Sequence, residues 1–324
     1  MVAFLVLKKF LKIVGIVLLL IILTLVIAAL IYGKSLLNKI NYEDVTRDQI
    51  EINEGVEEYL SEYRNIAILG LDARDNTFSN SRSDCIIIVS INNNTKDVKF
   101  VSVYRDTYLQ IDGYGLDKIT HAYAYNKAPL AISSINKNLD LDITEYVTIN
   151  FDSVTSIVDA IGGIQITVTD AEAKNIPGLT TGGTYNLTGA QALAYGRIRK
   201  IDSDYARTER MRNVLEKVFE KAKKMDVAKL NSLVNELLPK VSTNITQNEI
   251  VKMIPKIKDY NVVSSIGWPY EVRGITTDRW YAVPVTLEQN VKKLHEDLFG
   301  ESDYEVSKEV KEISEKIINK TGYR

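Results

Sequence analysis

R-S-D-C-I-I-I-V-S-I-N-N-N-T-K-D-V-K-F-V-S-V-Y-R-D, residues 82–106, is the stretch that decides the fold class. Two runs rich in Ile and Val flank an Asn-rich turn, which predicts a β-hairpin. Antiparallel pairing places Arg82 and Asp84, at the start of the first strand, beside Arg105 and Asp106 at the end of the second. Charged side chains from both strands are therefore predicted to gather at one edge of a sheet.

A second apolar run, N-I-A-I-L-G-L-D at residues 65–72, is typical of a buried strand. If it runs parallel to the second hairpin strand, Asp72 reaches the same edge. Arg74 and Asp75 follow in a loop rich in Ser and Asn. Ligands of open α/β sheets bind at the carboxyl ends of strands, so this edge is the candidate site.

The remaining pattern mixes strands and helices, which predicts a three-layer α/β/α sandwich around a mixed central sheet. Asp152 is the expected N-cap of the second helix. The strands are predicted at 146–151, 164–168, 262–266 and 280–283, and the helices at 129–138, 151–161, 190–194 and 211–222, with a helical pattern from 225 to 258.

The arginines concentrate in Y-G-R-I-R-K-I-D-S-D-Y-A-R-T-E-R-M-R, residues 195–212. Arg197 and Arg199 are two apart and would share one face of an extended strand. Arg207 and Arg210 extend the apolar stripe of the following helix toward its start, where anions bind. Planar guanidinium groups converging from a strand and a helix start suit a phosphate or diphosphate.

The alternative is that these arginines form ordinary surface ion pairs. Asp202, Asp204 and Glu209 lie within the same stretch and are the available partners. Such pairs would be structural and would leave no anion site.

Residues 13–32 contain no charged side chain and are long enough to cross a bilayer. Lys8, Lys9 and Lys12 precede this segment, so the positive-inside rule predicts a cytoplasmic N-terminus (1–12), one transmembrane helix (13–32) and an extracellular remainder. A cleaved signal peptide is the alternative, but its apolar core is shorter, roughly 7 to 15 residues. The chain is therefore expected to be a single-pass protein of the cell membrane.

The extracellular part divides into three segments by composition. Residues 33–64 are polar and acidic and are predicted to be a juxtamembrane linker. Residues 65–300 are predicted to form the folded extracellular domain that carries the candidate site, and residues 301–324 a charged, peripheral C-terminal helical tail. The formal net charge of −2 disfavours nucleic-acid binding.

Cysteine and histidine carry no recognisable site. The one cysteine, Cys85, is followed by three isoleucines and is predicted to be a buried, inert thiol. His121 and His295 lack metal-ligand spacing, which argues against zinc.

The combination of aspartates and arginines at the predicted sheet edge indicates a divalent cation other than zinc. Asp72 and Asp84 would hold a divalent cation, with Mg²⁺ expected, while guanidinium groups bind the phosphates that it bridges. The alternative is that both aspartates cap loops or pair with Arg74 and Arg82.

Seven motifs in order resemble the LytR-CpsA-Psr family. They are I-L-G-L-D-A-R-D (68–75), S-R-S-D-C-I-I-I-V-S-I-N (81–92), S-V-Y-R-D-T-Y (102–108), D-K-I-T-H-A-Y-A-Y (117–125), V-D-A-I-G-G-I (158–164), L-T-G-A-Q-A-L-A-Y-G-R-I-R (187–199) and D-Y-A-R-T-E-R (204–210). The resemblance implies a phosphotransferase that moves a glycopolymer, such as wall teichoic acid or capsule, from an undecaprenyl diphosphate carrier to peptidoglycan. It also implies pyrophosphate-bond cleavage.

The resemblance assigns roles to matching positions. Asp72 and Asp84 fall on the family's magnesium-associated aspartates. The phosphate-binding positions are Arg82, Arg105, Arg197, Arg199 and Arg207, with Lys118 and Arg210 as further candidates. Thr120 and Met211 stand where the family often has Asn and Gln, so contacts made by those amides are not expected here.

The implied mechanism is attack by a peptidoglycan hydroxyl on the phosphorus attached to the polymer. Mg²⁺ and the arginines, Arg105 among the catalytic residues, neutralise the developing charge. Asp84 or Asp75 accepts the hydroxyl proton, and the sequence leaves both open. The prenyl tail is expected in an apolar slot between the helices at 129–138, 151–161 and 211–222.

Two other functions remain open from the sequence. One is a non-enzymatic envelope regulator or sensor that binds polyprenyl phosphate. The other is a simple lipid pyrophosphatase, in which water replaces the sugar hydroxyl. Turnover separates the first from a transferase, and dependence on a peptidoglycan acceptor separates the second.

Overall fold

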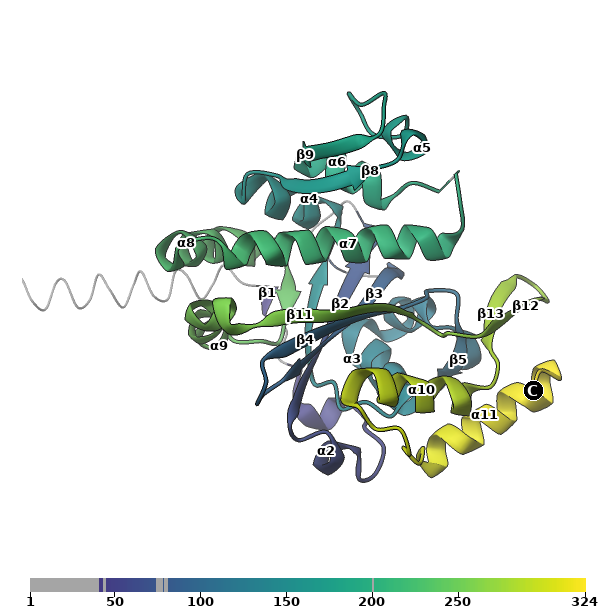
Figure 1. The fold of residues 1–324 in the computed structure, drawn as a ribbon. Coiled ribbons are helices and arrows are strands. Elements are labelled where there is room, and N and C mark those ends of the chain that lie inside the picture. The colour runs from purple at the N-terminus through teal and green to yellow at the C-terminus, as the bar shows by residue number, and fades with distance from the viewer. Residues whose placement is uncertain (1–40, 43–44, 74–77, 79–80, 200) are drawn as a thin grey trace, which may run out of the picture.

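The computed structural model describes residues 41–42, 45–73, 78, 81–199 and 201–324. Its centre is a seven-stranded sheet of order β1-β10-β7-β2-β3-β4-β11 (Figure 1). The strands are β1 (Asn41–Tyr42), β10 (Ser242–Thr243), β7 (Glu145–Ile149), β2 (Tyr63–Leu71), β3 (Ser83–Asn92), β4 (Asp97–Val103) and β11 (Asn261–Trp268).

The sheet is mixed, as predicted. β2 and β4 both pair antiparallel to β3, which confirms the hairpin and makes β2 run in the direction of β4. β7 is parallel to β2, and β11 is parallel to β4. The carboxyl ends of β2 and β4 therefore meet the start of β3 at one edge of the sheet.

Helices cover both faces of this sheet (Figure 1). One face carries α3, α10 and α11, and the other carries α7 with α8 and α9. The helices are α2 (Val56–Tyr59), α3 (Thr120–Leu139), α4 (Phe151–Ala160), α5 (Asp170–Ala173), α6 (Gly189–Gly196), α7 (Asp204–Lys223), α8 (Val227–Leu237), α9 (Gln247–Met253), α10 (Leu287–Phe299) and α11 (Lys308–Thr321), with 3-10 turns η1 (Arg47–Gln49), η2 (Leu238–Lys240) and η3 (Ile254–Asp259).

Three two-stranded hairpins flank the sheet. They are β5–β6 (Tyr108–Ile111 and Gly115–Lys118), β8–β9 (Ile164–Val168 and Gly183–Leu187) and β12–β13 (Val272–Thr276 and Trp280–Pro284).

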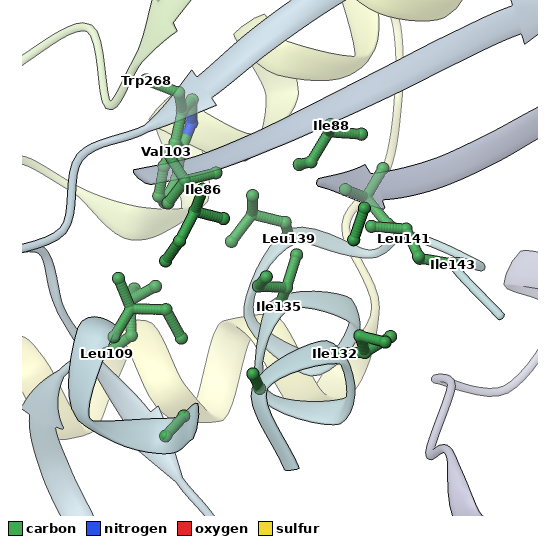
Figure 2. Packing of buried hydrophobic residues seen from close by; sticks show 14 of the residues in the cluster. Ile86, Ile88, Val103, Leu109, Ile132, Ile135, Leu139, Leu141, Ile143 and Trp268 are labelled. Atoms are coloured by element: carbon green, nitrogen blue, oxygen red, sulfur yellow. The ribbon is translucent and has the colours of Figure 1, made fainter. Parts of the chain in front are cut away.

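The apolar run of β3 is continuous because both of its faces are buried. Ile86 and Ile88 face the core beneath α3, where Ile132 and Ile135 pack (Figure 2). Ile87 faces the opposite core with residues of α7. Cys85 is buried in that second core as a free thiol, as predicted.

Two terminal segments differ from their predicted roles. Within the predicted linker, Ile50, Val56 and Leu60 are buried in the larger core instead. The predicted C-terminal tail contains α11, which instead packs Val310 and Ile313 against the same core. Both segments have apolar residues at spacings that the surrounding charged residues obscure.

Local signals account for two smaller differences. Asn150, not Asp152, is the N-cap of α4, because its side chain accepts the Ser153 amide at 2.8 Å. α3 begins earlier than predicted and kinks at Asn126 and Lys127, which accommodates Pro129.

The predicted transmembrane segment at 13–32 lies outside the described residues. Within the described part of the chain, no helix is both long and apolar enough to cross a bilayer.

Candidate active site

A small cavity of about 40 Å³ lies at the sheet edge predicted to be the site. It is bounded by the end of β2, the start of β3, the start of α4 and the first turns of α7. The lining residues are Gly70, Leu71, Asp84, Cys85, Ile149, Asn150, Phe151, Val154, Gly196, Arg197, Arg199, Arg207 and Met211. Four of the predicted site residues thus line one cavity.

Close packing shapes this cavity. A Cβ atom on Gly196 would approach the Met211 sulfur to 2.2 Å, so glycine lets the end of α6 pack against α7. A Cβ on Gly70 would lie 2.9 Å from the Cys85 Cβ. The first contact holds the segment that carries Arg197 against α7, and the second lets β2 and β3 approach closely at the cavity floor.

Arg105 forms the centre of an ionic network beside the cavity. Its Nη1 donates to Asp84 Oδ2 at 2.8 Å, and its Nε donates to Asp204 Oδ2 at 3.1 Å. Burial lowers the pKa of Arg105, but the charges of Asp84, Asp204 and Asp106 outweigh burial and raise it. Arg105 is therefore held firmly as a cation at the end of β4.

Arg207 is far less well compensated. It is 4% exposed, and its Nη2 donates to Asp204 Oδ2 at 3.3 Å. Its Nη1 lies 3.2 Å from Asp204 Oδ1 but makes no hydrogen bond within the described residues. Burial lowers the pKa of Arg207, and the positive charges of Arg105 and Arg199 lower it further. The negative charge of Asp204 raises the pKa, but not enough to offset these effects. A buried guanidinium with an unused N–H group is a prepared anion contact.

Arg197 and Arg199 reach the cavity from a loop rather than from the predicted strand. α6 continues to Gly196, and Arg197 is its C-cap, so the chain is not extended there. The Arg197 guanidinium lies over the Phe151 ring, 4.0 Å from its centroid. Arg199 is exposed, with Nη2 3.7 Å from Asp84 Oδ2.

The N-terminal ends of two helices also lie at the predicted anion site. α7 begins at Asp204 with Ser203 as its N-cap, and α4 begins at Phe151. The partial positive charge at both N-terminal ends adds to that of the arginines. The described residues around the cavity therefore favour an anion over a neutral ligand.

Arg210 occupies a separate setting. It is as buried as Arg207, but its Nη1 donates to Asp202 Oδ2 at 2.6 Å and its Nη2 donates to the Ile198 carbonyl at 2.9 Å. Glu172 lies 3.4 Å away. The structure places Arg210 in an ion-pair cluster on the wall of a separate polar cavity of about 500 Å³, and not among the residues that line the small cavity at the strand ends.

The other candidate residues lie at the rim or beyond it. Arg82 and Asp72 are exposed and adjacent, because the Asp72 amide donates to the Arg82 carbonyl at 3.4 Å. Lys118 pairs with Asp106 at 2.6 Å, next to Arg105. Asp75 lies outside the described residues.

Sequence reasoning assigned no site role to three residues that the structure brings to this site, although it placed Asp106 at the same sheet edge and named Asp204 as an ion-pair partner. Asp204 and Asp106 both bind Arg105, and Phe151 supports Arg197. Asp204 and Asp106 lie inside the quoted motifs, which was an available signal. Nothing in the local sequence marks Phe151, because its role depends on α4 packing beside α6.

A much larger cavity of about 460 Å³ lies on the α7 face of the sheet and is almost entirely apolar. Its walls come from β2, β3, β4 and β7 and from α4, α7, α8 and α9. The side chains include Ile66, Val89, Val98, Phe100, Val147, Ile157, Leu215, Val218, Phe219, Ala222, Leu233, Leu237, Ile250 and Met253. Two of the three helices predicted to wall an apolar slot do so, whereas α3 lies on the opposite face.

The two cavities follow one another along the strands. β2 contributes Ile66 to the apolar cavity and Gly70 to the small one, while α7 contributes Phe219 to the first and Arg207 to the second. An elongated ligand with an apolar tail and an anionic head fits this order.

Metal ligands are not preassembled in the described part of the chain, where no group of three or more His, Cys, Asp or Glu side chains is placed to hold an ion. Within the described residues, the hydrogen bond recorded at Asp84 Oδ1 is a long one, from Thr120 Oγ1 at 3.4 Å. Magnesium commonly takes one or two carboxylates together with substrate phosphates. Asp84 and Asp72 fit that partial ligand set.

Residues 28–298 match the LytR_cpsA_psr family. The chain is 32% identical over 224 residues to polyisoprenyl-teichoic acid–peptidoglycan teichoic acid transferase TagT of Bacillus subtilis (strain 168), covering 65% of this chain and 70% of that protein. It is similar to TagT solved bound to LIIa-WTA, with a TM-score of 0.61, 27% identity and coverage of 73% of this chain and 91% of the other. It is also similar to YwtF (TagT) solved with bound octaprenyl pyrophosphate lipid, with a TM-score of 0.58, 25% identity and coverage of 73% and 90%.

Proposed function

Because this chain belongs to the LytR-CpsA-Psr family, we propose that it transfers an anionic glycopolymer from a polyprenyl diphosphate carrier to peptidoglycan. The observation that carries the proposal is the succession of an apolar cavity and an arginine-lined cavity along the same strands. The polyprenyl tail lies in the first, and the diphosphate lies against the second. Octaprenyl pyrophosphate bound to a similar structure supports this arrangement.

The arginines contact the diphosphate from different sides of the site. Arg207 supplies the buried, unused N–H group, and Arg197 and Arg199 approach from the open side. Arg105 is held in place by three carboxylates, so its charge stays fixed beside the reacting phosphorus. Donors fixed before reaction stabilise charge that develops in the transition state.

The reaction joins an acceptor hydroxyl oxygen to the phosphorus that bears the polymer. The bond from that phosphorus to the bridging oxygen breaks, and polyprenyl phosphate leaves with the electron pair. The hydroxyl proton passes to a carboxylate. Asp84 lines the cavity and Asp75 follows β2 in sequence, and both remain candidates for this base.

Mg²⁺ bound by Asp84 and Asp72 would supply further charge neutralisation on the phosphates. Among the described residues, Asp84 Oδ1 has a long contact of 3.4 Å with Thr120 Oγ1, which leaves it room to bind a cation. Pyrophosphate-bond cleavage and magnesium dependence are part of this proposal.

We also propose that residues 13–32 anchor the chain in the cell membrane with its N-terminus in the cytoplasm. The reason is the uncharged length of that segment and the lysines before it. The domain would then act outside the membrane, where peptidoglycan is available.

A coupled assay tests the function. The full chain in detergent micelles would receive octaprenyl-diphosphate-linked polymer with or without peptidoglycan strands. We expect polymer attached to peptidoglycan together with stoichiometric octaprenyl phosphate. Equal diphosphate cleavage with and without strands, and no attached polymer, would instead identify a lipid pyrophosphatase. Binding of the lipid without turnover would identify a sensor.

A further inference from the structure

Three aromatic rings are exposed at the end of the fold beyond the arginine site. Tyr114, Tyr125 and Trp280 are 53%, 39% and 42% exposed. Tyr114 lies in the β5–β6 turn, Tyr125 lies in α3, and Trp280 begins β13. Large apolar rings that are exposed close together mark an interaction site more often than rings exposed singly.

These rings are held rigidly. Tyr114 and Tyr125 stack with centroids 4.0 Å apart and planes 3° apart, so each fixes the other. A Cβ on Gly274 would come within 2.6 Å of Trp280 Nε1, so the indole lies against the backbone of β12. A ring that is fixed before binding loses little entropy when a ligand packs on it.

Carboxylates and a cation accompany the rings. Asp117 Oδ2 accepts from the Tyr125 hydroxyl at 2.6 Å, and Asp278 Oδ2 accepts from Arg279 Nε at 3.0 Å. The hydrogen bond to Asp117 raises the pKa of Tyr125 to about 12, and the charge of Arg279 opposes that shift. The Tyr281 ring, next to Trp280, lies 4.8 Å from the Tyr108 ring and 5.7 Å from Lys118 Nζ, so the β12–β13 hairpin packs against the β5–β6 hairpin that carries Tyr114.

This aromatic surface, defined by Tyr114, Tyr125 and Trp280, adjoins the arginine site. Lys118, one residue after Asp117, pairs with Asp106. The Ala282 amide, two residues after Trp280, donates to the Asp106 carbonyl at 2.9 Å. Figure 1 shows β5, β12 and β13 at the same end of the fold as the start of α7.

We propose that the aromatic surface is the acceptor subsite, which binds the sugar rings of a peptidoglycan glycan strand. The C–H faces of pyranose rings pack on aromatic rings, and hydroxyl and acetamido groups at their edges hydrogen-bond to carboxylates and guanidinium groups. This inference rests on the proposed transferase function and extends it.

The in-line geometry of the reaction indicates that the aromatic surface binds the acceptor strand and not the polymer carried by the donor. The attacking and leaving oxygens lie roughly in line across the phosphorus. The leaving polyprenyl phosphate points along the strands toward the apolar cavity, from Gly70 back to Ile66. The acceptor must therefore approach from beyond Arg105, which is the side of the aromatic surface.

Steady-state kinetics of the full chain in detergent micelles tests the assignment. The donor is octaprenyl-diphosphate-linked polymer, and the acceptor is a soluble, uncross-linked glycan strand. Trp280→Ala and Tyr125→Ala should each raise the acceptor KM about tenfold. They should leave kcat at saturating acceptor and the donor KM within twofold, and Trp280→Phe should restore most of the acceptor affinity.

Controls address folding and general effects. Tyr59→Ala removes a ring of matched exposure, 38%, from α2 and should leave the acceptor KM unchanged. Tyr114→Ala, in an exposed turn, provides a further variant if Trp280→Ala melts early. An unchanged acceptor KM in the folded variants would overturn the proposal, as would a rise confined to the donor KM.

Titration of glycan strands into the protein without donor separates this inference from the proposed function. Binding by the wild type that weakens in Trp280→Ala supports the subsite even if no transfer occurs. Equal binding of glycan strands by the wild type and Trp280→Ala would rule out the proposed subsite even if the protein transfers polymer efficiently.

Discussion

Arg207 and Arg210 lie three residues apart in α7 and are equally buried, at 4% exposed, yet they face different ionic surroundings. Arg210 donates hydrogen bonds to Asp202 and to the Ile198 carbonyl, while its buried Nε makes none in the described structure. Arg207 lines the cavity at the strand ends with an Nη1 that makes no hydrogen bond in the described structure. Because only Arg207 lines the cavity at the strand ends, we propose that Arg207 binds the anion and that Arg210 serves mainly as an ion-pair partner of Asp202.

The Asp84→Ala and Asp72→Ala variants should differ in stability but should lose activity to a similar extent. Asp84→Ala removes a 2.8 Å ion pair from Arg105 and should lower the free energy of unfolding by about 1.5–3 kcal/mol. Asp72→Ala changes an exposed side chain and should alter it by less than about 0.5 kcal/mol. Both should lower magnesium-dependent turnover by about a hundredfold. Denaturant unfolding and turnover on the same preparations check this, and full activity in Asp72→Ala would refute its metal role.

Filling the apolar cavity should block the lipid tail without harming the fold. Ala222 lines that cavity, and Ala222→Phe adds a ring to its space. Affinity for octaprenyl pyrophosphate should fall at least about tenfold, whereas affinity for inorganic pyrophosphate should not change. Calorimetric titration measures both. Val227→Phe, at an exposed α8 position, is the control, and equal losses in both variants would contradict the assignment.

Stability should depend on pH through Asp142. Burial raises the pKa of Asp142 to about 6, despite a hydrogen bond from Asn65. The folded state therefore holds this proton more tightly than the unfolded state, and stability from the protonated form is lost as pH rises from about 4 to 6. Asp142→Asn should be more stable than the wild type by on the order of 2–3 kcal/mol at pH 7.5, with no advantage near pH 4. Denaturant unfolding of both proteins at both pH values tests this prediction. The same stability difference between variant and wild type at both pH values would exclude titration of Asp142 as the cause.

The predicted topology has a direct test. Protease added to intact cells stripped of their wall should digest the domain that follows residue 33, because residues 13–32 are expected to place it outside the membrane. Protection of that domain until the membrane is opened would contradict the extracellular assignment.

Alternating and continuous apolar patterns made the sheet predictable. The β3–β4 hairpin and the β2 strand follow from runs around Ile66, Ile87 and Val101, since their burial leaves few other arrangements. The site edge followed from strand direction alone. Asp84 and Arg105 meet because antiparallel pairing joins a strand start to a strand end.

Side-chain direction was harder to predict than element position. Residues three apart on a helix differ by roughly 60° around its axis, which is enough to place Arg207 and Arg210 in separate settings. Arg197 and Arg199 were wrongly expected on a strand because α6 continues to Gly196, and that depends on its contact with Met211. Contacts between distant segments decided each of these cases.

The measurement that tests the central claim most directly is the affinity for octaprenyl pyrophosphate of Arg207→Lys and Arg210→Lys, with melting temperatures on the same preparations. Lysine keeps the charge but loses the planar fork. Arg207→Lys should weaken binding about ten- to a hundredfold and leave the melting temperature level or higher. Arg210→Lys should lower the melting temperature and leave the affinity of the folded protein within twofold. The reverse pattern, or equal effects in both variants, would contradict a diphosphate site centred on Arg207.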